Sequence, residues 1–123
     1  DYSETFRHTL ARFRRRALLV ILTDLASGPA ADSLLPAMPL LTRNHLVVVG
    51  TVRDPSVTGW ADEPANDVSQ VYRKTAAVAS LTERERTIAR LRALGVTVID
   101  AVPGRLAPAL ADAYINVKST GRL

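Results

Sequence analysis

The stretch R-R-R-A-L-L-V-I-L-T-D-L, residues 14–25, decides the fold of this chain. Its centre, Ala17 to Leu22, is an unbroken apolar run, which is typical of a strand buried on both faces of a parallel sheet. Thr23 and Asp24 follow at the predicted carboxyl end of that strand. Because ligands of open α/β sheets bind at this end of the strands, we expect a hydroxyl and a carboxylate of a binding site here.

Two further apolar runs, His45–Val52 and Val96–Ala101, also read as strands. Amphipathic or capped segments between them predict helices over Tyr2–Arg16, Ala30–Thr42, Val68–Leu94 and Leu106–Ser119. Strands that alternate with helices imply right-handed crossovers and a parallel sheet. The predicted fold is therefore α/β, a three-layer Rossmann-like parallel sheet of about three strands with about four helices.

Three details of this assignment are open to structural test. Pro36 and Pro39 predict a kinked, late-starting or partly irregular second helix, and residues 56–65 read as a loop. A capping-box match, Thr82-x-x-Glu85, leaves open whether residues 68–94 form one helix or two that meet near Ser80. The inward stripe of this segment is predicted to be Val71, Thr75, Val78, Leu81, Ile88 and Leu91, and its charged outer face Glu83, Arg84, Glu85, Arg86, Arg90 and Arg92.

Length and composition limit the class of protein. With 123 residues, the chain is expected to form a single domain over 1–123. It does not begin with Met, and its first residues already read as the start of a helix, so we expect a fragment of a longer protein. The absence of cysteine excludes disulfides and Cys nucleophiles and suits a cytoplasmic location. No apolar run approaches the ~20 residues that span a bilayer.

A net charge of +4 and a pI of about 10.1 raise the question of nucleic-acid binding. The basic cluster Arg12 to Arg16 could carry such a function, and a basic nucleic-acid-binding domain is one alternative interpretation. Acidic residues are interspersed among the arginines, however, and cations near a helix end also complement the helix dipole. We therefore expect no nucleic acid as partner.

Polar residues follow all three predicted strands and should lie on one rim of the sheet. Asp24 and Thr23 offer the oxygen ligands that Mg²⁺ or Ca²⁺ prefers, although a cation site needs more converging oxygens than these two. A helix-capping or loop-stabilising role is the alternative for Asp24. We expect Asp54, which precedes Pro55, to stabilise a turn. Asp100 is expected to cap a helix or to form a local pair.

No motif pairs a nucleophile with a base. His8 and His45 lack a Ser, Cys or carboxylate partner at a recognisable spacing. We therefore expect a protein that is not an enzyme. A phosphoryl- or nucleotide-handling α/β enzyme that uses Asp24 as ligand or acceptor is the second alternative.

The chain resembles the C-terminal half of the bacterial family called domain of unknown function 58. The resemblance runs in order through four segments: R-R-R-A-L-L-V-I-L-T-D-L, L-L-T-R-N-H-L-V-V-V-G-T-V-R-D-P, E-R-E-R-T-I-A-R-L-R-A-L-G-V-T-V-I-D-A-V-P and L-A-P-A-L-A-D-A-Y-I-N-V-K-S-T-G-R-L. That family is similar to von Willebrand factor A domains, which carry a metal-ion-dependent adhesion site at their strand ends. The resemblance implies that Asp24 holds the position of the last aspartate of that site.

The resemblance also has functional implications. Family members resemble accessory proteins of MoxR-type AAA+ ATPases, often on membrane-anchored parents, which implies a protein-interaction module with such an ATPase as partner. The family's D-x-S-x-S motif does not occur in this chain, and Leu25 stands where a glycine is usual. We therefore expect no cofactor in this fragment, an incomplete metal site at Asp24 and Thr23, and Mg²⁺ only in the full-length parent.

The predicted strand order places the first strand at an edge of the sheet. A flat apolar edge invites pairing with another strand. We therefore expect either a further strand from upstream sequence or self-association into a homo-oligomer through this edge.

Overall fold

A computed structural model of the chain describes residues 4–5, 7–8, 16–25 and 28–121. Its elements are, in chain order, β1 (Leu18–Leu22), α2 (Gly28–Asn44), β2 (Leu46–Val52), α3 (Pro55–Asp62), α4 (Val68–Ala93), β3 (Thr97–Ala101) and α5 (Leu106–Ser119). Residues 4–5 and 7–8 are also helical, in agreement with the predicted first helix, whose other residues up to 15 lie outside the described part.

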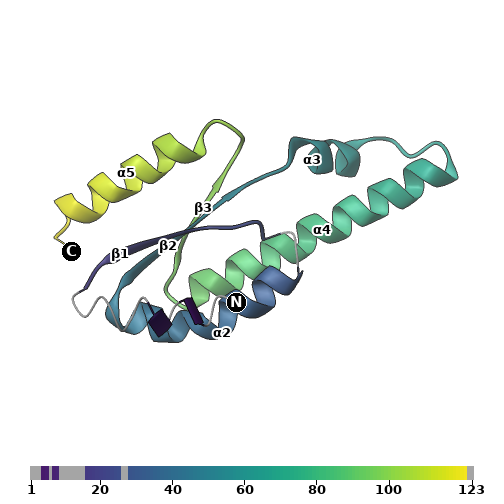
Figure 1. Ribbon diagram of the computed structural model, residues 1–123. Helices are drawn as coiled ribbons and strands as arrows, with labels where there is room; N and C mark the ends of the chain where they lie inside the picture. The colour runs from purple at the N-terminus through teal and green to yellow at the C-terminus, as the bar shows by residue number, and fades with distance from the viewer. Residues whose placement is uncertain (1–3, 6, 9–15, 26–27, 122–123) are drawn as a thin grey trace.

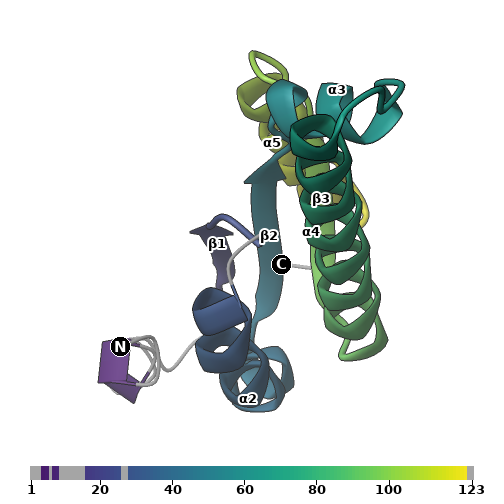
Figure 2. The same ribbon diagram turned by 90° about the vertical axis from the view of Figure 1, so that its right-hand side faces the viewer.

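The three strands form one parallel sheet in the order β1-β2-β3. Val20 of β1 lies opposite Val48 of β2, and Val49 of β2 lies opposite Val98 of β3. Helices α2 and α4 cover one face of the sheet and α5 covers the other (Figures 1 and 2). The structure therefore confirms the α/β class and the three-layer parallel arrangement.

The main core lies between the sheet and the helices α2 and α4. Val47, Val49 and Val98 point toward these helices from the sheet, as the alternation of strand side chains requires. The helices supply Leu34, Met38, Leu41, Ile88 and Leu91 to this core, and Leu25 and Val96 join it from the segments beside the strands. These residues are all buried, which makes this layer the main source of stability from apolar burial.

Helix α2 differs from its prediction. It begins at Gly28, ends at Asn44 and contains both Pro36 and Pro39, whereas the sequence predicted a late start and irregular backbone. Both prolines are exposed to solvent. The carbonyl groups that lose an N–H partner to proline can therefore bond to water, while Leu34, Met38 and Leu41 hold the inner face in the core.

The segment after β2 was predicted wrongly as a loop, because residues 55–62 form the helix α3. The Asp54 carboxylate accepts a hydrogen bond from the backbone N–H of Ser56 at 2.9 Å, and Pro55 occupies the first turn. Both are favourable starts of a helix. The Gly, Asp and Pro content of the segment concealed this signal.

Helix α4 is one helix of 26 residues, which settles the open question at Ser80. Asp67 caps its start by accepting from the backbone N–H of Gln70 at 2.8 Å. Gly95 follows it with φ of 88°, a conformation that favours glycine at a helix end. The predicted inward stripe is only half correct, because Val71, Thr75 and Val78 are exposed whereas Ile88 and Leu91 are buried.

The layer on the opposite face is thinner, because α5 alone packs there among the described elements. It spans the predicted residues and contacts β2 and β3 through the side of the sheet that carries Gly50. A Cβ atom on Gly50 would lie 3.0 Å from Cδ2 of Leu22 and 3.2 Å from Cδ1 of Leu106. Val117 of α5 is buried, whereas Tyr114 is exposed.

Candidate functional site

A small cavity lies at the carboxyl ends of β1 and β2, where the sequence placed the binding site. Its volume is about 110 Å³. We call it the strand-end cavity. Its lining residues come from the segments after both strands, from α3 and from α4, and are Asp24, Val52, Arg53, Asp54, Val57, Ser80, Leu81 and Arg84.

The structure brings Asp24 and Asp54 to this cavity from two different strand ends. Asp24 is exposed, and one oxygen of Asp54 is occupied as the cap of α3. Thr23 is half-buried, donates its backbone N–H to the carbonyl of Gly50 at 3.1 Å, and is not part of the cavity lining. The cavity therefore brings Asp24 together with Arg53 and Asp54 from the next strand end, whereas Thr23 is not among its lining residues.

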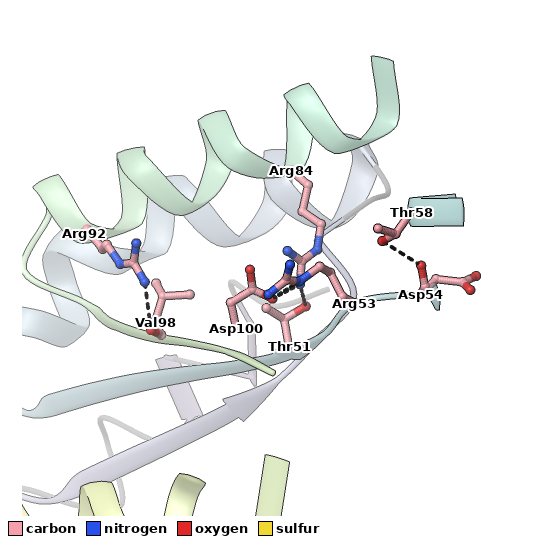
Figure 3. Close-up of polar contacts among 8 residues, drawn as sticks. All are labelled: Thr51, Arg53, Asp54, Thr58, Arg84, Arg92, Val98 and Asp100. Carbon is pink, nitrogen blue, oxygen red and sulfur yellow. Dashed lines mark hydrogen bonds and ion pairs between the residues drawn. The ribbon is translucent and has the colours of Figure 1, made fainter. Parts of the chain in front are cut away.

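Arg84 is buried, with a relative exposure of 5%, although the sequence placed it on the outer face of its helix. Its Nη2 donates to Oδ1 of Asp100 at 2.6 Å and to Oγ1 of Thr51 at 3.4 Å (Figure 3). The prediction failed because alternating charges favoured a solvated face. The spacing of Ala77, Arg84, Ile88 and Leu91 could have revealed the error, since these residues share one side of a helix.

Asp100 also forms an ion pair with a second arginine. Nε of Arg53 lies 3.6 Å from the same oxygen, Oδ1. The hydrogen bond from Arg84 is the main reason why the pKa of Asp100 lies below its ordinary value of 3.8, and the positive charges of Arg84 and Arg53 add to this effect against the opposing effect of burial. Asp100 is therefore a paired carboxylate, as the sequence suggested, and two positive charges share it.

This charge distribution bears on the predicted cation. Asp24 and Asp54 supply two carboxylates to the strand-end cavity, but Arg53 and Arg84 supply two guanidinium groups to the same lining. Within residues 4–5, 7–8, 16–25 and 28–121, no three His, Asp or Glu side chains are grouped so as to hold a metal ion. Ligands from another chain or from further sequence would have to complete a metal site at Asp24.

Neither histidine belongs to the lining of this cavity. His45 is buried at the amino end of β2, where its Nδ1 accepts the backbone N–H of Ala17 at 3.0 Å, so it helps to join the starts of two strands. His8 is exposed on the helical residues near the amino terminus. In the cluster Arg12 to Arg16, only Arg16 belongs to the described residues, and it is exposed.

Two larger hollows lack a paired carboxylate and base. One, of about 430 Å³, lies between α2 and α4 and is lined by Leu35, Pro36, Pro39, Arg90, Ala93 and Leu94. The other, of about 530 Å³, lies at the amino end of α4 around Val71 and Tyr72. Neither contains a carboxylate and a base arranged for chemistry, so the strand-end cavity is the strongest candidate site.

Comparison with known proteins identified no relative of this chain. The chain matches no protein-family model, no curated protein and no solved structure. The resemblance to domain of unknown function 58 therefore stays a prediction from the sequence. In the part of the chain that the structure describes, no helix has both the length and the apolar character needed to cross a membrane.

Proposed function

We propose that this chain is a non-enzymatic protein-interaction module that binds its partner at the carboxyl ends of β1 and β2. The size of the strand-end cavity carries the proposal. A volume of about 110 Å³ accommodates a single side-chain head group or an ion, whereas sites for whole small molecules usually occupy about 300–1,000 Å³. This size favours one anchoring group of a protein partner over a nucleotide or a metabolite.

The rim of the cavity supports recognition by charge. Asp24, Arg53 and Asp54 are all exposed, so both signs of charge are available to a partner at one place. Arg84, which also lines the cavity, is held by hydrogen bonds to Asp100 and Thr51. Charged groups held in this way give specificity and orientation to an interface.

The identity of the partner rests on the resemblance. It supports a MoxR-type AAA+ ATPase, a cytoplasmic location, and a complete parent protein in which Mg²⁺ joins Asp24 to a carboxylate of the partner. The two arginines beside Asp24 favour the simpler form of this proposal, in which a charged side chain of the partner meets Asp24, Arg53 or Asp54 without a metal.

The test is calorimetric titration with a purified MoxR-type ATPase, with and without Mg²⁺. Asp24→Asn should weaken binding about tenfold, because a desolvated charged contact contributes on the order of 1–3 kcal/mol. Asp112→Asn, which changes an exposed carboxylate on α5, is the matched control and should bind like the parent chain. Equal binding by both variants would remove Asp24 from the interface.

The same samples separate the alternatives. Turnover of phosphate esters that disappears in Asp24→Ala would show an enzyme. Binding to DNA at low salt, where phosphate contacts are strongest, would support the basic cluster instead. Thermal stability that rises with Mg²⁺ in the parent chain but not in Asp24→Ala would establish the cation at Asp24.

A further inference from the structure

The outer edge of β1 has no strand beside it among the described elements. In the part of the chain that the structure describes, β1 pairs with β2 on one side only. The two end bonds of that ladder, from Leu46 N–H to the carbonyl of Ala17 and from Thr23 N–H to the carbonyl of Gly50, involve odd-numbered residues of the β1 segment. Successive residues of a strand point their polar groups to opposite sides, so the N–H and C=O groups of Leu18, Val20 and Leu22 point outward.

The side chains of this edge are also available. Val20 is 48% exposed and Leu22 is 61% exposed, on the face where α5 contacts β2 and β3. The strand LLVIL contains no charged residue, no proline and no glycine. It therefore lacks the devices by which natural edge strands avoid pairing with another chain.

We propose that this edge binds the same edge of a second copy of the chain, as an antiparallel pair centred on Val20. Val20 then lies opposite the partner's Val20, and Leu18 lies opposite the partner's Leu22. The outward N–H and C=O groups of three residues in each copy meet their counterparts, and the two sheets become one. Such a contact is a two-fold, self-complementary interface.

Charge selects the second copy and the antiparallel direction. Arg16 precedes the strand and Asp24 follows it, both exposed and both in the alternation of Leu18, Val20 and Leu22. The register centred on Val20 places Arg16 opposite the partner's Asp24 at each end of the pair. A parallel pair in register would instead place Arg16 opposite the partner's Arg16, and like charges directly opposite one another are unfavourable.

This inference does not depend on the proposed function, but the two share one residue. Asp24 near a second copy's arginine is less accessible to another partner, so dimerisation and partner binding compete for it. The oligomeric state is measured without ATPase and without Mg²⁺, and failure of one proposal therefore leaves the other standing.

The first test is sedimentation velocity over a wide range of protein concentration. The parent chain should form a dimer, and Val20→Lys should weaken it about tenfold, because the register places the two lysines directly opposite each other and like charges there are unfavourable. Val68→Lys is the control, since Val68 is 72% exposed and lies at the far end of α4 (Figure 1). A monomeric parent chain, or equal effects of both variants, would overturn the proposal.

A charge reversal tests the register. Arg16→Asp and Asp24→Arg should each weaken the dimer about tenfold, because two attractive pairs become repulsive, and the double variant should restore it. A dimer that another surface forms would show no such rescue.

Far-ultraviolet circular dichroism confirms that the variants fold. Amide exchange at Leu18, Val20 and Leu22 should be slower in the dimer than in the monomer, which provides a readout that needs no variant.

If the edge belongs to a strand from another part of a longer protein, that longer protein should be monomeric, with the same three amides protected at every concentration. That outcome would replace the second copy with the upstream strand as the occupant.

Discussion

The two halves of α4 share one sequence pattern but have different surroundings. In the carboxyl-terminal half, Arg84, Thr87, Ile88 and Leu91 are buried. In the amino-terminal half, Val68, Val71 and Tyr72 are exposed, and among the described elements the neighbour there is α3 (Figure 1). The difference teaches that an amphipathic stripe indicates which side of a helix can pack, while the length of the neighbouring sheet decides how much of it does.

Simple dimensions explain the difference. A helix of 26 residues is about 39 Å long, whereas the longest strand, β2, has seven residues and a length of about 23 Å. The amino-terminal half of α4 therefore extends past the sheet. Its contacts there include the guanidinium of Arg73, which lies 5.6 Å from the ring centre of Trp60 and forms an ion pair with Glu63 at 3.2 Å.

The sharpest contrast between the halves should come from Leu91, whose side chain is fully buried between α2, α4 and the sheet. Leu91→Ala should lower the free energy of unfolding by about 3 kcal/mol, because it removes buried methyl groups and leaves a cavity. Urea denaturation measures this loss. A loss below about 1 kcal/mol would mean that this half is packed much more loosely than the structure shows.

Arg84→Met should have the next largest effect. It leaves the partly buried Asp100 without its hydrogen bond at 2.6 Å, and we expect a loss of about 2 kcal/mol in the free energy of unfolding. Arg86→Met is the matched control on the same helix, because Arg86 is exposed and its pair with Glu83 spans 3.8 Å. Similar losses in both variants would contradict the distinction between a buried and a solvated arginine.

The pH dependence of stability should show the same ion pair with a smaller effect. The pKa of Asp100 is lower in the folded chain than its ordinary value of 3.8, so the ionised group stabilises the fold above that value. This contribution should disappear as the pH falls through the lowered pKa. The difference in unfolding free energy between the parent chain and Asp100→Asn should therefore shrink from about pH 5 downward. A constant difference would show that Asp100 is not stabilised as a carboxylate.

The smallest effect is expected at the exposed end of the stripe. Val71→Ala should change the free energy of unfolding by less than about 0.5 kcal/mol, because Val71 is half exposed and alanine favours a helix. Its comparison with Leu91→Ala measures how far the sheet supports α4. A large loss at Val71 in dilute solution would show that this half packs against something.

The sequence was most informative where burial dictates residue type. The apolar runs of β1 and β2 identified parallel strands, and the limits of α5 were predicted correctly, because these segments have one dominant environment. Segments where local signals compete were predicted less well. The prolines of α2 and the turn-forming residues of α3 indicated irregular backbone, but packing of Leu34 and Met38 and capping by Asp54 determined the outcome.

The candidate site shows the same limit. The strand-end positions of Asp24, Asp54 and Asp100 followed from the order of the elements, and the cavity includes the first two. The burial of Arg84 did not follow, because its partners Thr51 and Asp100 are 33 and 16 residues away along the chain. These hydrogen bonds join a helix to the ends of two strands and form only once the sheet has assembled, so no local sequence pattern predicts them.

The close packing around Gly50 should affect which residues occur at this position in related sequences. The φ of Gly50 is not among the positive values of the described residues, which occur at Gly95, Gly104 and Gly121, so close packing rather than backbone conformation favours a glycine there. Leu22 and Leu106 occupy the volume that a methyl group would need. In a collection of homologous sequences, position 50 should therefore vary with positions 22 and 106. Alanine at position 50 should occur more often where one of those leucines is smaller.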